Sequence, residues 1–197
     1  MNAPLEEANA GLIKQARAGD ARAFEALAKE VERPLYRHVQ RIVGESADAE
    51  DCVQDALFSA WRSIRAFEGD SFRAWIFRIA TNRALDRLRS RKRHPELPLD
   101  PPADDAEITW AEPATPGPDL VQIVGDREAL AAVEAALATL PVDQRTVLLL
   151  RDIEGFAYEE IAVITAVEIG TVKSRIHRGR LAVRNALVAK GWRGSAG

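Results

Sequence analysis

The chain has 197 residues, of which 47% are hydrophobic, so it is long enough to form one or two domains with buried cores. Its formal net charge is −3, and its single cysteine excludes an internal disulfide and a cysteine-based zinc site. It has no charged-then-apolar N-terminal signal and no apolar run of about 18 residues, which predicts a cytoplasmic protein without a membrane-inserted segment.

Apolar residues recur at helical rather than alternating spacing along almost the whole chain, which predicts an all-α protein. Asp20 and Asp48 are placed to cap two helices, and Pro34 fits the first turn of a helical continuation. Cys52 falls among apolar helix positions and is interpreted as a small buried hydrophobe. In the N-terminal half, helices are expected over residues 12–17, 21–44, 48–64 and 71–93.

The third and fourth of these helices carry the candidate binding residues of the N-terminal half. Asp51, Gln54 and Asp55 lie on the third helix, opposite its apolar stripe. Phe77 falls off the apolar stripe of the fourth helix, and Phe67 lies in the preceding loop, so both rings are expected to be exposed. Aromatic rings among cations suit single-stranded DNA, because bases stack on the rings while the cations hold the backbone.

A stretch of different composition separates the two halves. Seven of the ten prolines fall between Pro95 and Asp119, and the stretch from His94 to Asp126 holds eight acids but no lysine or arginine. This composition predicts a flexible acidic, proline-rich linker over residues 95–125. We therefore expect two small helical domains, residues 1–94 and 126–192, followed by a frayed tail at 193–197.

The C-terminal domain ends in a helix-turn-helix pattern. A short amphipathic helix is predicted over residues 158–165, a tight connection over 166–168, and a long basic helix from residue 169. In this arrangement the second helix enters the major groove of DNA. The spacing therefore predicts a DNA-reading helix near the C-terminus.

The reading helix divides into an apolar stripe and a polar face. Thr171, Ser174, Arg175 and Arg178 share the polar face, which favours them for contacts to bases. Arginine can bond guanine through two hydrogen bonds, and short hydroxyls reach phosphate oxygens. Lys173 and Arg180 are left for phosphate or solvent on the same reasoning.

Charge is strongly segregated along the chain. Residues 71–93 hold eight lysines and arginines against one acid, and residues 168–193 hold seven against one. Residues 45–55 hold five acids and no base. This distribution predicts two nucleic-acid surfaces, together with acidic surfaces for another partner.

Three segments resemble signature segments of the extracytoplasmic-function group of bacterial sigma factors. They are residues 48–61 (DAEDCVQDALFSAW), 72–86 (FRAWIFRIATNRALD) and 170–180 (GTVKSRIHRGR). They occur in the family's order, with the linker between the second and the third. The resemblance covers roughly residues 10 to 190.

The resemblance implies two helical domains, sigma region 2 and sigma region 4, in a protein that binds core RNA polymerase, recognises a promoter and helps to open it. It also implies an anti-sigma factor as a partner. No residue pattern marks a cofactor or a metal site, so neither is expected. The loop over residues 65–70 resembles the one that captures a flipped base of the minus 10 element. Carried over residue by residue, the contacts are Asp51, Gln54 and Asp55 to the clamp helices of the beta-prime subunit, Phe67, Phe77, Asn82, Arg83 and Asp86 to the minus 10 element, and Thr171, Lys173, Ser174, Arg175, His177 and Arg178 to the minus 35 element.

Two other classes of function, an enzyme and a regulator that acts without polymerase, compete with the sigma factor interpretation. The acids at 45–55 lack a nearby histidine, the three histidines (His38, His94 and His177) are scattered and are interpreted as surface groups, and no phosphate loop or nucleophile pattern occurs, which argues against an enzyme. The closer alternative is a helix-turn-helix regulator that binds duplex DNA without polymerase. For the linker, threading of the polymerase RNA path and a plain tether that raises effective concentration both remain open.

Overall fold

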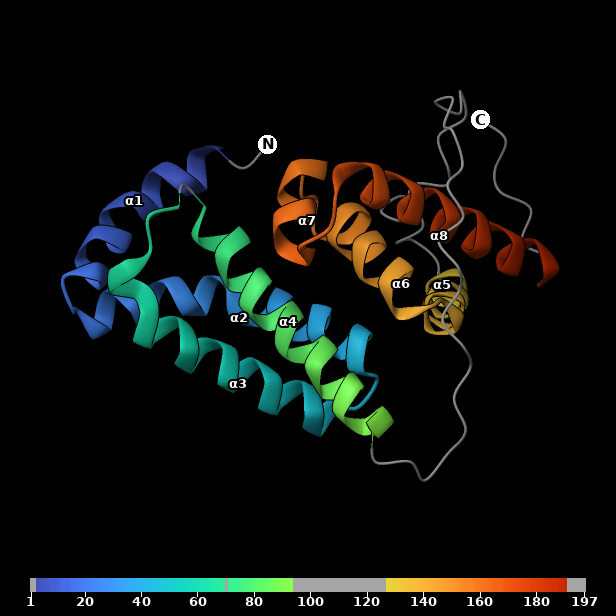
Figure 1. Ribbon diagram of the computed structural model, residues 1–197, viewed down its shortest axis with the longest axis horizontal. Coiled ribbons are helices and arrows are strands. Elements are labelled where there is room, and N and C mark those ends of the chain that lie inside the picture. Colours follow the sequence, from blue (N-terminus) through green and yellow to red (C-terminus); the bar gives the residue numbers. More distant parts are fainter. Residues whose placement is uncertain (1–2, 70, 94–126, 191–197) are drawn as a thin grey trace.

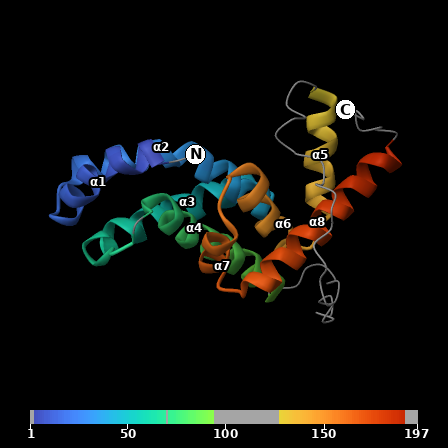
Figure 2. The same ribbon diagram turned by 90° about the horizontal axis from the view of Figure 1, so that it is seen from above.

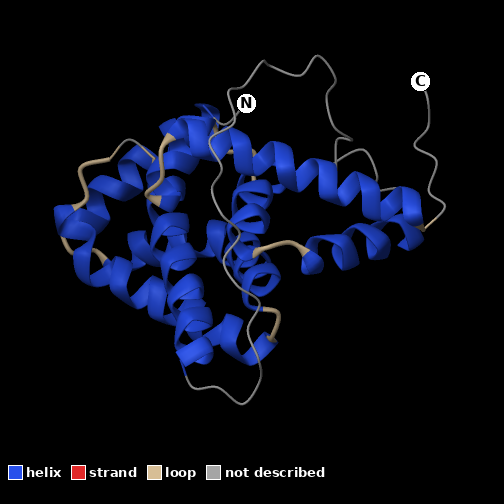
Figure 3. Cartoon of the chain, turned by 45° about the vertical axis from the view of Figure 1, so that its right-hand side comes forward, coloured by secondary structure: helices blue, strands red, loops and turns tan. Residues whose placement is uncertain are grey.

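The computed structural model describes residues 3–69, 71–93 and 127–190, and every element within those ranges is helical (Figure 3). This confirms the expected all-α fold with two helical domains. The predicted linker at 95–125 and the tail at 193–197 lie outside the described residues. The helices of the first unit are α1 (Ala3–Arg17), α2 (Ala21–Val43), α3 (Ser46–Ser63), the 3-10 turn η1 (Ile64–Ala66) and α4 (Phe72–Arg93).

In the first unit, α2 packs against α1, α3 and α4, while α3 and α4 lie side by side (Figure 1). Asp20 caps α2 as predicted, because its carboxylate accepts hydrogen bonds from the backbone N–H groups of Arg22 and Ala23. Gly44 ends the helix in the left-handed region, with φ of 83°. The core between these helices includes Leu27, Leu35, Ile42, Ile64 and Ile76.

Three local predictions for this unit are wrong. Pro34 does not lie in a first helical turn, because α2 runs unbroken through it, with Val31 and Leu35 buried on either side. Asp48 does not cap α3, which begins at Ser46, and its carboxylate instead faces α4. His38 is not a surface group but is fully buried on the inner side of α2. In each case, packing between helices decides the outcome.

The second unit contains α5 (Arg127–Thr139), α6 (Val142–Leu148), a π-helical turn η2 (Leu149–Ile153), α7 (Tyr158–Thr165) and α8 (Ile169–Ala189). The long α8 packs on α5, α6 and α7, and α5 stands steeply against it (Figure 2). Gly179 of α8 is buried and faces α6, where a Cβ at this position would lie 3.4 Å from Leu148 Cδ2, an ordinary contact distance. Side chains from α6, α7 and α8 form the core, with Leu148, Ile161 and Leu187 almost completely buried.

The two units also contact each other. Helix α7 packs on α4, and α6 approaches α2, so the second unit rests on the first (Figure 1). The side of the first unit formed by α2 and α4 is therefore covered in part by α6 and α7.

Candidate nucleic-acid interface

The outer face of α3 carries the three residues predicted to bind a protein partner. Asp51, Gln54 and Asp55 are all exposed, and the side chain of Asp51 keeps 71% of its surface accessible. Phe58 is on the same side of the helix, three residues after Asp55, and is 62% exposed. The guanidinium of Arg62 lies 5.8 Å from the centre of that ring. The face thus combines acids with one exposed aromatic ring.

Sequence reasoning missed Phe58, although the signal was present in the spacing. Positions 51, 54, 55 and 58 are separated by three and four residues, which places them on one face of a helix. A large exposed aromatic side chain on such a face is a common feature of a binding surface.

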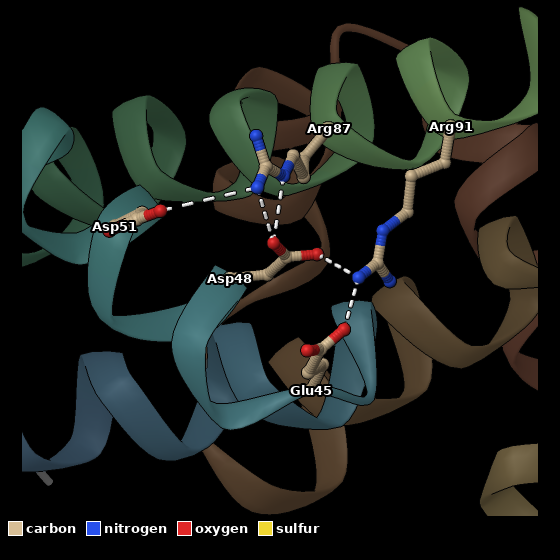
Figure 4. A network of polar contacts seen from close by, with 5 residues as sticks. All are labelled: Glu45, Asp48, Asp51, Arg87 and Arg91. Atoms are coloured by element: carbon tan, nitrogen blue, oxygen red, sulfur yellow. Dashed lines mark hydrogen bonds and ion pairs between the residues drawn. The ribbon is translucent and has the colours of Figure 1, made fainter. Parts of the chain in front are cut away.

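An ion-pair network joins the beginning of α3 to the C-terminal half of α4 (Figure 4). Asp48 accepts a 2.9 Å hydrogen bond from Arg87 Nε and also pairs with Arg91, which contacts Glu45 as well. The Asp48 side chain is only 6% exposed, and the hydrogen bond from Arg87 lowers the pKa of its carboxyl. Asp51 lies at the edge of this network, 4.0 Å from Arg87. The network fixes α3 and α4 relative to each other.

This pairing changes the interpretation of the basic run in α4. Arg87 and Arg91 meet the acids of α3, Arg89 pairs with Asp86 at 3.0 Å, and Arg73 pairs with Glu154 at 2.8 Å. Much of the positive charge that predicted a nucleic-acid surface is therefore balanced within the protein. The acidic run at 45–55 and the basic run of α4 are in part each other's partners.

Of the minus 10 candidates, three polar residues are exposed on α4. They are Asn82, Arg83 and Asp86, which follow one another at steps of one and three. Arg83 donates a 3.1 Å hydrogen bond to Ser59 Oγ on α3, which holds its side chain across the gap between the two helices. The three residues form one polar edge beside α3.

The two aromatic minus 10 candidates are buried, so the prediction that their rings are exposed is wrong. Phe67 is 5% exposed, with its ring centre 4.8 Å from that of Trp75. Phe77 is fully buried, and its ring contacts Phe156 of the second unit at 5.1 Å. Helical periodicity predicted the apolar stripe of α4 from that helix alone. In the structure, α4 is covered by α7 as well as by α2 and α3.

The helix-turn-helix forms with the predicted bounds. Helix α7 ends at Thr165, and Ala166 turns the chain with a left-handed φ of 55° before α8 begins at Ile169. At the other end of α7, the carboxylate of Glu160 accepts a 2.8 Å hydrogen bond from the backbone N–H of Ala157. The turn at Ala166 thus sets the direction in which α8 leaves α7, while the Glu160 bond caps the first turn of α7.

The burial of α8 defines which of its faces is available. Val172, Ile176, Gly179 and Val183 face the core, so at about 100° per residue the opposite face centres near Ser174. His177 lies on that side, Lys173 and Arg178 flank it, and Thr171 lies beyond Arg178. Lys173 is exposed, while the others are partly buried. Ser174 Oγ donates a 3.0 Å hydrogen bond to the Thr171 carbonyl and lies 3.4 Å from Arg178 Nη2.

Two arginines of α8 are held by acids of the same unit. Arg175 keeps only 16% of its side chain exposed and pairs with Asp143 of α6 at 3.1 Å. Arg180 donates from Nε to Asp152 at 3.0 Å, and Asp152 is almost buried. Arg175 thus links α8 to α6, a contact that its predicted place among the base-contacting residues did not include. Arg180 was expected to contact phosphate or solvent, but it pairs with an acid of its own unit.

Cys52 is buried as predicted, and burial raises the pKa of its thiol. Within residues 3–69, 71–93 and 127–190, no three histidine, cysteine or acidic side chains gather in an arrangement that could hold a metal ion. In the same part of the chain, no helix is both long and apolar enough to cross a bilayer.

Comparison with known proteins matches both halves of the chain. The Sigma-70 region 2 family model matches residues 27–94, and the Sigma-70 region 4 model matches residues 130–183. The RNA polymerase sigma-H factor of Pseudomonas aeruginosa is 36% identical over 186 residues, which cover 92% of this chain and 95% of that protein. This chain belongs to the sigma-70 family.

The sigma factor falls within the extracytoplasmic-function group. The ECF RNA polymerase sigma-E factor of Escherichia coli K12 is 34% identical over 181 residues, covering 88% of this chain and 91% of that protein. Among solved structures, CnrH in complex with the cytosolic domain of CnrY is similar with a TM-score of 0.65 and 27% identity, covering 90% of this chain and 96% of CnrH. The sigma factor RpoE of Bartonella quintana, in complex with the anti-sigma factor NepR, is similar with a TM-score of 0.63 and 28% identity, covering 84% of this chain and 96% of RpoE.

Membership fixes the general activity. The protein is a polymerase-binding sigma factor that acts in transcription initiation at promoter DNA. The alternative of a regulator that binds duplex DNA without polymerase is therefore wrong.

Proposed function

We propose that this sigma factor docks on the clamp helices of the polymerase through the outer face of α3, with Asp51, Gln54 and Asp55 as polar contacts. Their common exposure on one face supports the assignment. Phe58 extends the same face by an exposed aromatic ring and serves as its apolar anchor. The Asp48 network supports this role from behind, because it holds α3 in place while leaving the outer face accessible.

We assign contacts with the minus 10 element to Asn82, Arg83 and Asp86, which form the exposed polar edge of α4. Phe67 and Phe77 stay outside this assignment in the arrangement described, because their rings are buried. Promoter opening would then depend on this edge together with the docked polymerase. The proposed first domain spans residues 1–94 and the second spans residues 126–192.

For the minus 35 element we assign the side of α8 that faces away from the core, with Ser174, His177 and Arg178 at its centre and Lys173 and Thr171 at its margins. Their support is the burial pattern of α8, whose opposite face enters the core. Arg175 takes a positioning role, because its guanidinium pairs with Asp143 and fixes α8 on α6. Loss of a positioning arginine weakens binding to every promoter alike. Loss of a base-reading arginine weakens binding only through the one promoter position that it reads.

An anti-sigma factor is a proposed partner, since the structurally similar sigma factor RpoE is held in a complex with the anti-sigma factor NepR. The protein acts in the cytoplasm, where the polymerase works on the chromosome, and as an initiation factor it has no catalytic step of its own.

The observation that carries the proposal is the presence, in one chain, of a helix with an exposed acidic face and a helix-turn-helix whose second helix turns a polar face away from the core. Transcription by purified core polymerase on pooled genomic DNA, with and without the protein, tests it. New transcript starts downstream of a shared two-part motif are expected. The absence of new starts with folded protein would overturn the proposal.

A further inference from the structure

Three arginines of α4 contact α3 in a row, and we call these arginines and their α3 partners, Asp48 and Ser59, the arginine seam. Arg83, Arg87 and Arg91 follow one another at steps of four, which places them on one stripe of α4. Arg83 donates a 3.1 Å hydrogen bond to Ser59 Oγ. Arg87 and Arg91 both pair with Asp48 (Figure 4).

The seam runs along both helices. Asp48 and Ser59 are eleven residues apart, about three helical turns, so they share one side of α3. The later residue of α3 meets the earlier arginine of α4, which makes the two helices antiparallel. The bridges at its two ends therefore restrain both sliding and rotation of α4 against α3.

Asp48 is the most shielded member of the seam. Its side chain is 6% exposed, whereas those of Arg87 and Arg91 keep 46% and 43% of their surface accessible. Arg87 donates to one carboxylate oxygen from Nε at 2.9 Å and from Nη2 at 2.5 Å, and Arg91 Nη2 lies 2.5 Å from the other oxygen. Asp48 thus has almost no surface left for polymerase or DNA, and both its oxygens face α4.

Both proposed binding surfaces of the first unit adjoin the seam. On the outer face of α3, Asp51 follows Asp48 by three residues and lies 4.0 Å from Arg87. On α4, Arg83 belongs both to the seam and to the polar edge, and Asp86 directly precedes Arg87. The seam is therefore the polar connection between the helix assigned to polymerase and the helix assigned to the minus 10 element.

The chemistry of these bridges suits them to fix a geometry. Apolar packing between α3 and α4 is non-directional, so it tolerates small shifts of one helix along the other. A guanidinium that donates two hydrogen bonds to a carboxylate accepts a narrow range of orientations. The Arg87 fork on Asp48 is such a bridge, and its position along α3 specifies the register of α4.

We propose that Asp48 and Arg87 are positioning residues for promoter opening, because the seam fixes the outer face of α3 against the polar edge of α4. The inference rests on the proposed function, in which these surfaces bind polymerase and the minus 10 element. Docking uses one face of α3, which α2 also holds in place, so a shift of α4 affects it little. Opening needs both helices at once, since one is held by polymerase and the other holds the minus 10 element.

Asp48→Asn gives opposite results for positioning and for a simple effect of charge. The variant keeps the shape of the side chain and all three arginines, but removes the negative charge that holds them. If the arginines acted only by attracting phosphates, losing this acid should tighten DNA binding and speed opening. If the seam positions α4, opening should slow by about tenfold or more, the effect of losing a hydrogen bond between charged groups.

Variants of Arg87 test the other half of the pair. Arg87→Gln should slow opening as Asp48→Asn does, and Arg87→Lys should recover part of the rate, because an ammonium keeps the charge but lacks the rigid fork. The double variant Asp48→Asn with Arg87→Gln should be little worse than either single variant, since both remove the same contact. Additive losses would instead show that Arg87 acts on DNA independently of Asp48, and would overturn the proposal.

The measurements use the full chain in holoenzyme reconstituted with core polymerase. A fluorescent base analogue at minus 10, in a promoter identified from mapped transcript starts, reports the opening rate at saturating holoenzyme. Competition with labelled parent protein reports the affinity for core polymerase, which should fall far less than the opening rate. Asp20→Ala is the matched control, because it removes the cap of α2 and lowers the stability of the same unit without touching the seam.

Four results would overturn the proposal. They are an opening rate like that of the parent in both Asp48→Asn and Arg87→Gln, faster opening by Asp48→Asn, a loss of core affinity as large as the loss of opening rate, and equally slow opening by Asp20→Ala. Circular dichroism and a melting curve establish that each variant is folded.

Asn82→Ala separates a failure of the positioning role from a failure of the proposed function. Asn82 lies on the polar edge of α4 but outside the seam. Its variant should open the promoter slowly while keeping its affinity for core polymerase. Slow opening by Asn82→Ala with normal opening by the seam variants would remove the positioning role alone. Normal opening by Asn82→Ala would overturn the minus 10 assignment and the positioning role with it.

Discussion

Acidification should destabilise the first unit through His38. This residue is fully buried on α2, its Nε2 lies 3.0 Å from Thr81 Oγ1, and its ring centre lies 5.2 Å from that of Phe77. Burial, together with the positive charges of Arg41 and Arg73, lowers the pKa of His38 from 6.5 to about 3. The folded protein therefore keeps the ring neutral at pH values where the unfolded chain has bound a proton.

The sign and size of the effect follow from this difference in proton binding. Above pH 6.5 the ring is largely neutral in both states and adds little pH dependence. Below it the unfolded state binds more protons, so the free energy of unfolding falls by about 1.4 kcal/mol per pH unit until the pH approaches the folded pKa of His38. Lowering the pH from 7 to 5 should remove about 2 kcal/mol through this residue.

Urea unfolding at pH 7, 6 and 5 measures the effect. The fluorescence of Trp61 and Trp75 reports on the first unit once Trp110 and Trp192 are replaced by phenylalanine. His38→Gln removes the titrating ring and leaves an amide near Thr81. Between pH 7 and pH 5, the free energy of unfolding of this variant should fall by about 2 kcal/mol less than that of the parent protein.

The matched control is His177→Gln, which removes a histidine of α8 and should retain the pH dependence of the parent. Parallel loss of stability in the parent and His38→Gln would refute the reasoning, because the destabilisation would then come from other groups.

Three further predictions concern the binding surfaces and their support. Asp51→Arg with Asp55→Arg should abolish binding to core polymerase in a pull-down while leaving the melting temperature nearly unchanged, since exposed acids contribute little to stability; retained binding would remove the docking assignment. Arg175→Ala and Asp143→Ala should each weaken binding to all minus 35 variants uniformly, whereas a loss of about 1 to 3 kcal/mol confined to one base position in a binding scan would restore base reading by the arginine. Asp48→Ala should lower the free energy of unfolding, measured in urea, by about 1 to 3 kcal/mol, because the buried carboxylate accepts hydrogen bonds from charged arginines that are themselves partly exposed. A change near zero would show that the network orients α3 and α4 without stabilising the fold.

The sequence by itself determined the elements whose signals are local. The spacing of Val172 and Ile176 predicted the inner face of α8, and the bounds of the helix-turn-helix were predicted from residues that are neighbours in the chain. Asp20 was predicted as a cap because a cap bonds to residues two and three positions further on. The signature segments likewise predicted the family from contiguous residues, and the comparisons confirm it.

The tertiary structure decided which side chains are accessible and which charges are already paired. Phe77 was expected to be exposed because it falls off the stripe of α4, but a second unit, about 80 residues later in the chain, covers it with Phe156. Asp48 has its partners on α4, with Arg87 39 residues away in the sequence. Helical periodicity predicts which face of a helix is apolar. Burial and ion pairing depend on which other helix packs against that face, and only the tertiary structure determines which helix that is.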